Sequence, residues 1–310
     1  MIPEKFNPIE RALIAAAAMP APKSRQILKL ICEAGMTTTK DVPQETEGQK
    51  HYAKREKIIK RMKSAADRVI DYSKHETLRN CDTHFRENPQ WAQSKPIKSA
   101  EGDTPPPDSL ASKLAFKKPR FSEEFLAALR EESAVALGVA GQQLFDEIGV
   151  DDPWKLPGTD SIKFLDARAN LLANAPDEIH AEVMQTIQDG LEHGETKKEL
   201  MARISTAFEG IKQSRADTIA NTETAAAFNY ARDKAMRKAG VTHKKWLHSM
   251  SPLIKEPRPT HLEADGQVRP LDEPFDIGGV AMMHPGDESA PADEIINCSC
   301  VALPVEAPKK

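Results

Sequence analysis

The stretch from Arg215 to Cys300 constrains the fold most, because its pattern changes from helix to strands and turns within one segment. It opens with a long helical pattern that ends at Gly240, where glycine favours a helix C-terminus. Beyond Gly240, prolines and glycines separate short apolar pieces, which is typical of strands and turns. We therefore predict an α+β protein that is predominantly helical, with a small β-rich C-terminal unit after a long helix at about 214–239.

Local signals also predict where helices begin. Ser122 is expected to cap a helix over residues 121–149, and Ser214 is expected to cap the long helix. Gly138 and Gly141 are candidate breaks in the first of these helices. The remaining patterns predict helices at about 160–172, at about 177–191 and at about 196–208, where Thr196 and Glu199 match a capping box.

Charge and proline content divide the chain into three parts. Residues 1–120 carry 23 Lys and Arg against 15 Asp and Glu, whereas residues 121–310 carry 20 against 32. The stretch KPIKSAEGDTPPPDS has three consecutive prolines, which favour stiff polyproline II over a packed element. We therefore expect a helical N-terminal arm at 1–87, a proline-rich linker at 88–120 and a second domain at 121–310.

Residues 50–79 form a basic helix pattern with one apolar face. This segment has ten Lys or Arg against four Asp or Glu, while Ile58, Met62 and Val69 recur at helical spacing. One interpretation is a helix that binds an acidic partner or DNA phosphates. The other is an ordinary amphipathic helix with a soluble outer face. Binding to single-stranded nucleic acid favours aromatic side chains between the basic ones, and no such aromatic platform is present here.

The chain has few cysteines and no long apolar run. Four cysteines in 310 residues are too few for a disulfide scaffold and fit a reducing cytosol. The most apolar early run, residues 12–19, is eight residues long, against about 20 for a helix that spans a membrane. We therefore expect no membrane association.

One face of the long helix mixes short polar side chains with small apolar ones. At about 100° per residue, Arg215, Thr222 and Asn229 lie within a narrow arc, and Glu223 and Tyr230 lie at its edge. A solvated face is one interpretation. The other is a half-buried polar network against another element, in which each buried group needs a partner.

Cys298 and Cys300 are the one closely spaced cysteine pair. On a strand, both thiols would lie on the same face. Imidazoles from His261 and His284 would then complete a tetrahedral zinc set. The spacing differs from that of common zinc motifs, so two cysteines packed as small apolar side chains are the alternative.

The same region contains candidate catalytic groups. The candidate bases are His243, His248, His261 and His284, and the candidate orienting acids are Glu223, Asp265 and Asp287. No nucleophile lies in a recognisable signature, and the chain has no glycine-rich phosphate loop. We therefore expect no enzyme activity. The alternative is a metal-dependent enzyme or effector that uses the His/Cys cluster.

Together these motifs resemble those of the Mu F-like minor head proteins of tailed bacteriophages, also called phage head morphogenesis proteins. The matching pieces are GLEHGETKKEL at 190–200, RADTIANTET at 215–224, RPTH at 258–261, HPGD at 284–287 and NCSC at 297–300. The residues of the motif are Arg215, Thr222, Glu223, Asn229, Trp246, Arg258, His261, Asp265, Gly266, Phe275, Asp287, Cys298 and Cys300. The resemblance covers about residues 140–303.

Two positions depart from the family pattern. Asn221 and Ser299 each stand where the family typically has arginine. Both departures remove a cation, so a contact made through those arginines is not expected in this chain.

The resemblance implies a structural minor head protein that is associated with the portal vertex and acts in procapsid assembly, DNA packaging or delivery. It implies a location in the virion, in the head interior or at the portal vertex, and in the host cytoplasm during assembly. The implied partners are portal, capsid or scaffold proteins, and packaged DNA for the basic arm. It does not imply an established catalytic activity, and we expect no cofactor other than the zinc that the His/Cys cluster could bind. A nucleic-acid-binding module that uses residues 50–79 stays an alternative.

Overall fold

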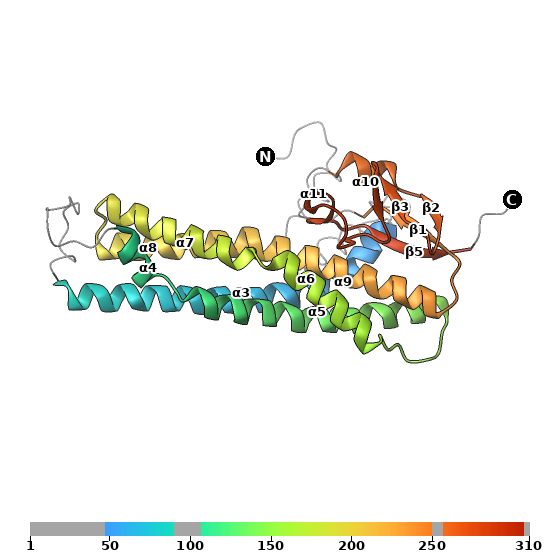
Figure 1. Cartoon of the computed structure of the whole chain (residues 1–310), viewed down its shortest axis with the longest axis horizontal. Coiled ribbons are helices and arrows are strands. Elements are labelled where there is room, and N and C mark those ends of the chain that lie inside the picture. The colour runs from blue at the N-terminus through green and yellow to red at the C-terminus, as the bar shows by residue number, and fades with distance from the viewer. Residues whose placement is uncertain (1–46, 90–106, 250–256, 307–310) are drawn as a thin grey trace, which may run out of the picture. The chain divides into compact units, whose positions relative to one another are not determined.

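The computed structural model describes residues 47–89, 107–249 and 257–306, which belong to one compact unit that begins at Glu47 (Figure 1). Long helices come first along this unit, and short strands follow near its C-terminus. The predicted fold class is confirmed, since the protein is α+β and mostly helical with small antiparallel sheets at the C-terminal end. The first 46 residues of the expected N-terminal arm lie outside the described residues.

The long helices pack side by side, with α5 and α9 in the most extensive contact and α3 against both. The helices of this part are α3 (Glu47–Glu87), α4 (Pro107–Leu114), α5 (Lys118–Ile148), α6 (Gly158–Leu172), α7 (Ala175–Glu192), α8 (Lys197–Ile211), a short π-helix (Lys212–Ala216) and α9 (Asp217–Lys238). Among the residues that the structure describes, no helix is both long enough and apolar enough to cross a membrane.

Helix α5 begins four residues before the expected cap. Pro119 lies in its first turn, where a proline's fixed φ suits the helix and its missing N–H is not needed. Ser122 Oγ instead donates to the carbonyl of Lys118 within the helix, so the predicted cap is wrong. The predicted end is correct, because Gly149 follows the helix with φ 72°.

Helix α8 has the predicted capping box and then continues into the long helix. Thr196 Oγ1 accepts from the backbone N–H of Glu199, and the Glu199 carboxylate accepts from the backbone N–H of Thr196. The π-helix joins α8 to α9 without a break. Ser214 Oγ donates to the carbonyl of Gly210 inside this continuous helix, so the predicted cap at Ser214 is wrong.

Helix α3 packs along the other helices and is not a separate arm. Its apolar face, which includes Ile58, Met62 and Ile70, is buried against α5, α8 and α9. Burial of such a face stabilises the docked position, because each apolar side chain leaves water. The structure therefore does not divide the chain at residues 88–120.

The C-terminal part of the expected linker belongs to the core. Leu110 and Leu114 of α4 are buried, and so is Phe116. The Phe116 ring lies 4.8 Å from the Phe121 ring. Pro107, the last proline of the run, is the first residue of this packed helix, because proline is compatible with a helix start. The linker prediction is wrong for residues 107–116.

Basic residues of α3 pair with acidic residues on the other helices. The nitrogen–oxygen distances are 2.6–2.9 Å in the pairs Lys54–Glu147, Arg61–Glu132, Lys63–Asp217 and Lys74–Glu209. These pairs are partly exposed, so each contributes at most about 1 kcal/mol. They nevertheless place part of the positive excess of α3 against the acidic excess of the rest of the chain.

Gly141 lies within α5 and does not break it. The Trp154 ring packs directly against the helix at this position. A Cβ at Gly141 would lie 2.1 Å from that ring, whereas a Cβ at Gly138 would meet no atom within 4 Å. We expect Gly141→Ala to lower the free energy of unfolding by about 1–3 kcal/mol. Gly138→Ala, at an exposed helical position, should raise it by about 1 kcal/mol. Urea unfolding measures both, and equal stability of the two variants would contradict the close contact with Trp154.

The β-rich unit consists of two small antiparallel sheets with two short helices. Strands β1 (His243–Leu247), β2 (Val268–Pro270) and β5 (Val301–Val305) form a sheet in the order β2-β1-β5. Strands β3 (Phe275–Ile277) and β4 (Val280–Met282) form the other. The short helices are α10 (Pro259–Glu263) and α11 (Ala292–Ile295). β5 lies at the edge of its sheet and packs against α9.

Candidate metal centre

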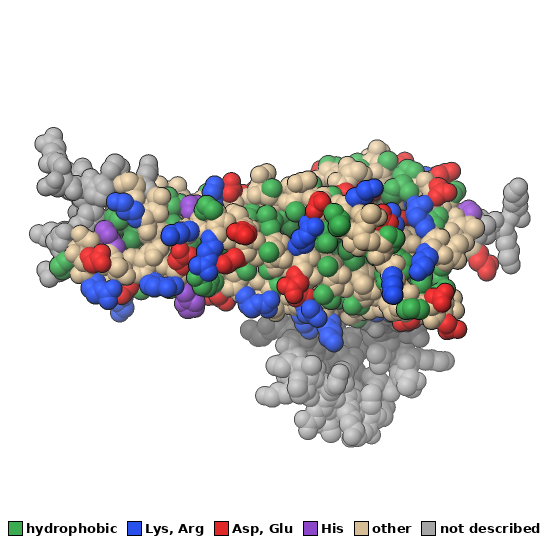
Figure 2. All heavy atoms as spheres, turned by 60° about the horizontal axis from the view of Figure 1, so that its bottom comes forward, with side chains coloured by type: hydrophobic (Ala, Val, Ile, Leu, Met, Phe, Trp, Pro, Cys, Tyr) green, Lys and Arg blue, Asp and Glu red, His purple; other side chains and the backbone are tan. Residues whose placement is uncertain are grey.

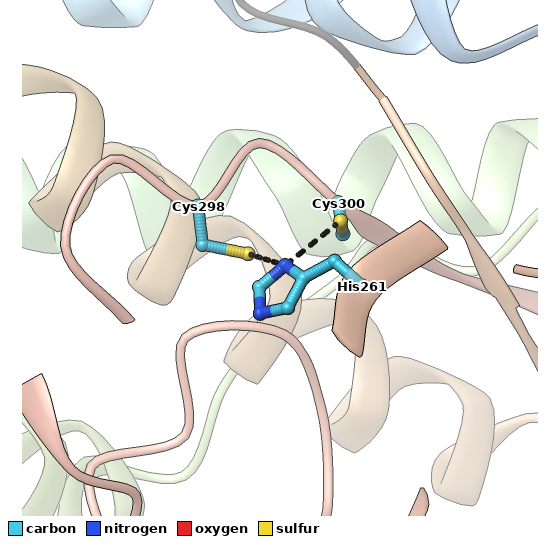
Figure 3. A group of neighbouring side chains, drawn as sticks. All are labelled: His261, Cys298 and Cys300. Atoms are coloured by element: carbon cyan, nitrogen blue, oxygen red, sulfur yellow. Dashed lines mark hydrogen bonds between the residues drawn. The ribbon is translucent and has the colours of Figure 1, made fainter. Parts of the chain in front are cut away.

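His261, Cys298 and Cys300 converge in the core of the β-rich unit (Figure 3). His261 lies on α10, and the two cysteines lie in the segment directly before β5. Nδ1 of His261 is 3.7 Å from Sγ of Cys298 and 3.5 Å from Sγ of Cys300. One ring nitrogen therefore faces both sulfur atoms, as Figure 3 shows.

The two cysteines reach this position from a turn and not from a strand, because β5 begins at Val301. Asn297 has φ 57°, a left-handed conformation that asparagine adopts more readily than most residues. The backbone N–H of Cys298 donates to the carbonyl of Ile295, which closes the turn. The expected strand at these positions is wrong, but the expected approach of both thiols to His261 is present.

A second histidine approaches the group, and it is not the one expected. Nδ1 of His248, the residue directly after β1, is 3.7 Å from Sγ of Cys300. His284 lies elsewhere: its ring packs edge-on against Tyr230 at 5.8 Å, and its Nδ1 is 3.3 Å from the carbonyl of Pro285. The structure therefore brings together three of the four expected ligands, and it places His248 and not His284 beside Cys300.

A carboxylate orients the His261 ring. Nε2 of His261 is 2.9 Å from Oε2 of Glu294 on α11, and the same oxygen accepts from Oγ1 of Thr260. A carboxylate on one ring nitrogen fixes which nitrogen carries the proton and directs the other toward its ligand. Nδ1 of His261 is therefore directed at the two sulfur atoms.

The thiols and the imidazole change one another's protonation. Hydrogen bonding with Cys300 and with His261 outweighs burial and holds the pKa of the Cys298 thiol well below its ordinary value. Burial and the contact with Cys298 raise the pKa of the Cys300 thiol. Burial lowers the pKa of His261, but the contact with Cys298 outweighs it and raises that pKa overall. Thiolate is the form of cysteine that binds metals and attacks electrophiles.

The group is enclosed by the core. Cys298 and Cys300 are each 1% exposed, and His261 is 2% exposed. The Trp246 ring, itself buried, lies edge-on to the His261 ring at 5.4 Å and to the Phe275 ring at 5.3 Å. Structural metal sites are closed in this way, whereas catalytic sites keep one position open to water or substrate.

Polar side chains of the helices bind the backbone around the cysteines. Asn229 on α9 donates from Nδ2 to the carbonyl of Cys300 and accepts at Oδ1 from the N–H of Ala302. Thr222 Oγ1 accepts from the N–H of Asn297. Arg55 on α3 donates to the carbonyl between the two cysteines, that of Ser299. The polar face of the long helix is therefore a network against the β-rich unit.

Glu223 takes part in a buried ion pair. Its two oxygens accept from Nε and Nη2 of Arg168 on α6, at 2.8 and 2.5 Å. Both side chains are at most 4% exposed. Arg215 does not join this network, because it pairs with Glu178 and Glu182 of α7 at the surface.

The other motif residues hold the loops of the β-rich unit. Arg258 donates to the carbonyl of Ile296, and Asp265 accepts from the backbone N–H of His248. Gly266 follows with φ 80°, in the turn that leads into β2. Asp287 accepts from the backbone N–H groups of Met283 and Ser289, and it also accepts from the Ser289 hydroxyl. Arg258 and Asp265 thus bond to backbone groups next to the Cys/His group of His248, His261, Cys298 and Cys300, whereas Asp287 bonds to the segment around His284.

Several residues of the site had no recognisable signal in the sequence. His248 was predicted only as a candidate base, and Glu294 and Arg55 match no motif. Arg168 did carry a signal: it lies four residues after Phe164, so a charged residue falls on the buried face of α6. A charge at such a position indicates a buried partner, because an unpaired buried charge is strongly unfavourable.

Comparison with known proteins agrees with the resemblance. Residues 177–303 match the family described as phage Mu protein F like protein. The uncharacterized protein YqbB of Bacillus subtilis (strain 168) is 27% identical over 194 residues, which is 61% of this chain and 63% of that protein. The chain thus spans less than two thirds of that relative's length. No solved structure matches the chain significantly.

The matched residues run from α7 to β5 and include the whole Cys/His group. The family is one of phage head morphogenesis proteins. Residues 177–303 of this chain are therefore similar to phage Mu protein F-like proteins.

Proposed function

We propose that this protein is a structural component of a tailed-phage head, present in few copies at the portal vertex, where it acts in head assembly and DNA packaging. The phage Mu protein F-like region supports a role in head morphogenesis. The portal-vertex location and the low copy number are carried over from the resemblance to the minor head proteins.

The arrangement of the motif residues carries the structural side of this proposal. Asn229, Thr222 and Glu223 are buried and bind other parts of the same chain. His261, Cys298 and Cys300 are enclosed as well. A catalytic site has to admit a substrate, whereas these side chains join the helices to the β-rich unit. This favours a non-enzymatic protein over the metal-dependent enzyme.

The charge distribution favours protein partners over nucleic acid. The face in Figure 2 interleaves basic, acidic and apolar side chains. On α3, Lys54, Arg61, Lys63 and Lys74 already have acidic partners within the chain. DNA binding depends on basic side chains that are free to neutralise phosphates. We therefore propose portal, capsid or scaffold proteins as partners.

Quantitative mass spectrometry of purified phage heads tests this function. We expect the protein in complete heads at a small fraction of the major capsid protein, because one portal vertex offers few binding positions. Heads assembled without the portal should contain much less of it.

The major capsid protein serves as the internal control, since its amount per head does not depend on the portal. Absence from complete heads would reject a head component. Equal amounts with and without the portal would reject the portal-vertex location.

A further inference from the structure

We propose that His248, His261, Cys298 and Cys300 bind one zinc ion that joins the parts of the β-rich unit. The proposal rests on the positions of these four side chains and does not depend on the role in the phage head. Two thiolates and two imidazoles are a common ligand set of structural zinc sites.

The distances between the ligand atoms fit a tetrahedral zinc ion. Zinc–sulfur bonds of about 2.3 Å and zinc–nitrogen bonds of about 2.0–2.1 Å, at tetrahedral angles, place sulfur and nitrogen about 3.6 Å apart. His261 Nδ1 is 3.5 Å from Cys300 Sγ and 3.7 Å from Cys298 Sγ. His248 Nδ1 is 3.7 Å from Cys300 Sγ. The ligand atoms of His261, Cys298 and Cys300 lie within 4.8 Å of one another, and His248 approaches them beside Cys300, where a bound ion would draw its ring into the fourth position.

The contacts around His261 match those of a metal ligand. The Glu294 carboxylate accepts a hydrogen bond from Nε2 of His261, which keeps the ring proton on Nε2 and leaves Nδ1 directed at the sulfur atoms as a metal ligand. Thr260 in turn donates to Glu294. For His248, Asp265 holds the backbone N–H, which fixes the end of β1 beside Cys300.

Hydrogen bonding and apolar packing explain this arrangement less well. A lone pair on Nδ1 of His261 accepts one hydrogen bond, yet two sulfur atoms lie within 3.7 Å of it. Cysteines packed as apolar side chains would not require two ring nitrogens in contact with their sulfur atoms. A shared cation satisfies the sulfur atoms and the nitrogens together.

The zinc ion would stabilise a unit that has little regular structure of its own. β2, β3 and β4 are three residues each, so their ladders contain few hydrogen bonds. The four ligands come from the end of β1, from α10 and from the turn before β5. Zinc binding is coupled to folding when the ligands come from separate segments, as they do here.

Metal analysis of the full-length protein, purified under reducing conditions without added metal, is the first test. We expect about one zinc ion per chain. A strong chelator should remove it and lower the melting temperature. Cys298→Ser and Cys300→Ser should each lose most of the bound zinc, and His248→Ala should weaken zinc binding by more than about tenfold.

His284→Ala is the matched control, because His284 is a buried histidine of the same unit that lies outside the group. It should keep the full zinc content. If the cysteine variants do not fold, reconstitution of the wild-type protein with Co²⁺ replaces them as a test. Tetrahedral cobalt bands with a thiolate charge-transfer band would support the site. A protein that binds neither zinc nor cobalt, or that loses zinc in His284→Ala but not in His248→Ala, would overturn the proposal.

Discussion

Glu223→Gln is expected to lower the free energy of unfolding by about 3–5 kcal/mol, because it leaves the buried Arg168 without a counter-charge. The guanidinium donates two hydrogen bonds to the Glu223 carboxylate, and the two side chains are 4% and 2% exposed. Glutamine keeps the shape and one acceptor of the side chain but not the negative charge. Urea denaturation of the variant and the wild-type protein, with unchanged m-values, measures the loss.

Two controls separate charge from packing. The double variant Arg168→Met with Glu223→Leu removes both charges. It should lower the free energy of unfolding much less than Glu223→Gln does, because no unpaired charge remains. Arg130→Met breaks the Arg130–Asp166 pair, which is exposed on both sides and should cost less than about 1 kcal/mol. A loss below about 1 kcal/mol in Glu223→Gln would contradict the buried pair.

Asn229→Leu is expected to lower the free energy of unfolding by about 2–6 kcal/mol, since it leaves two buried backbone groups without partners at about 1–3 kcal/mol each. Asn229 is fully buried and bonds to the carbonyl of Cys300 and the N–H of Ala302. β5 lies at the edge of its sheet, so this side chain supplies the hydrogen bonds that a neighbouring strand would supply.

Hydrogen exchange of the Ala302 amide tests the contact itself. Its exchange should be faster in Asn229→Leu than the loss of global stability alone predicts. Asn170→Leu is the matched control, because Asn170 is exposed on α6 and its replacement should change stability by at most about 0.5 kcal/mol. Unchanged protection of the Ala302 amide would contradict the role of Asn229.

The polar network and the proposed zinc site meet at one residue. The carbonyl of Cys300 binds Asn229 of α9, while its sulfur atom faces His261 and His248. The carbonyl of Ser299, next to it, binds Arg55 of α3. The segment before β5 is thus held by helices on its backbone side and by the Cys/His group on its side-chain side. Loss of zinc is therefore expected to loosen the contact of α9 with β5 as well.

The sequence by itself determined the features that depend on neighbouring residues. The capping box at Thr196 and Glu199, the end of α5 at Gly149 and the change from helix to short strands after Gly240 were all predicted correctly. Such signals work because a cap or a turn is formed by groups within about four residues of one another. The fold class followed from the same local patterns.

Only the tertiary structure decided which distant residues meet. His248 and His284 are both histidines near turns, and the pairing of β1 with β5 places the first beside Cys300. Helix α3 was expected to be a separate arm, but its apolar face and its ion pairs place it against α5, α8 and α9. These outcomes depend on how apolar faces fit together and on where the chain reverses, and neither is encoded in the spacing of residues along one segment.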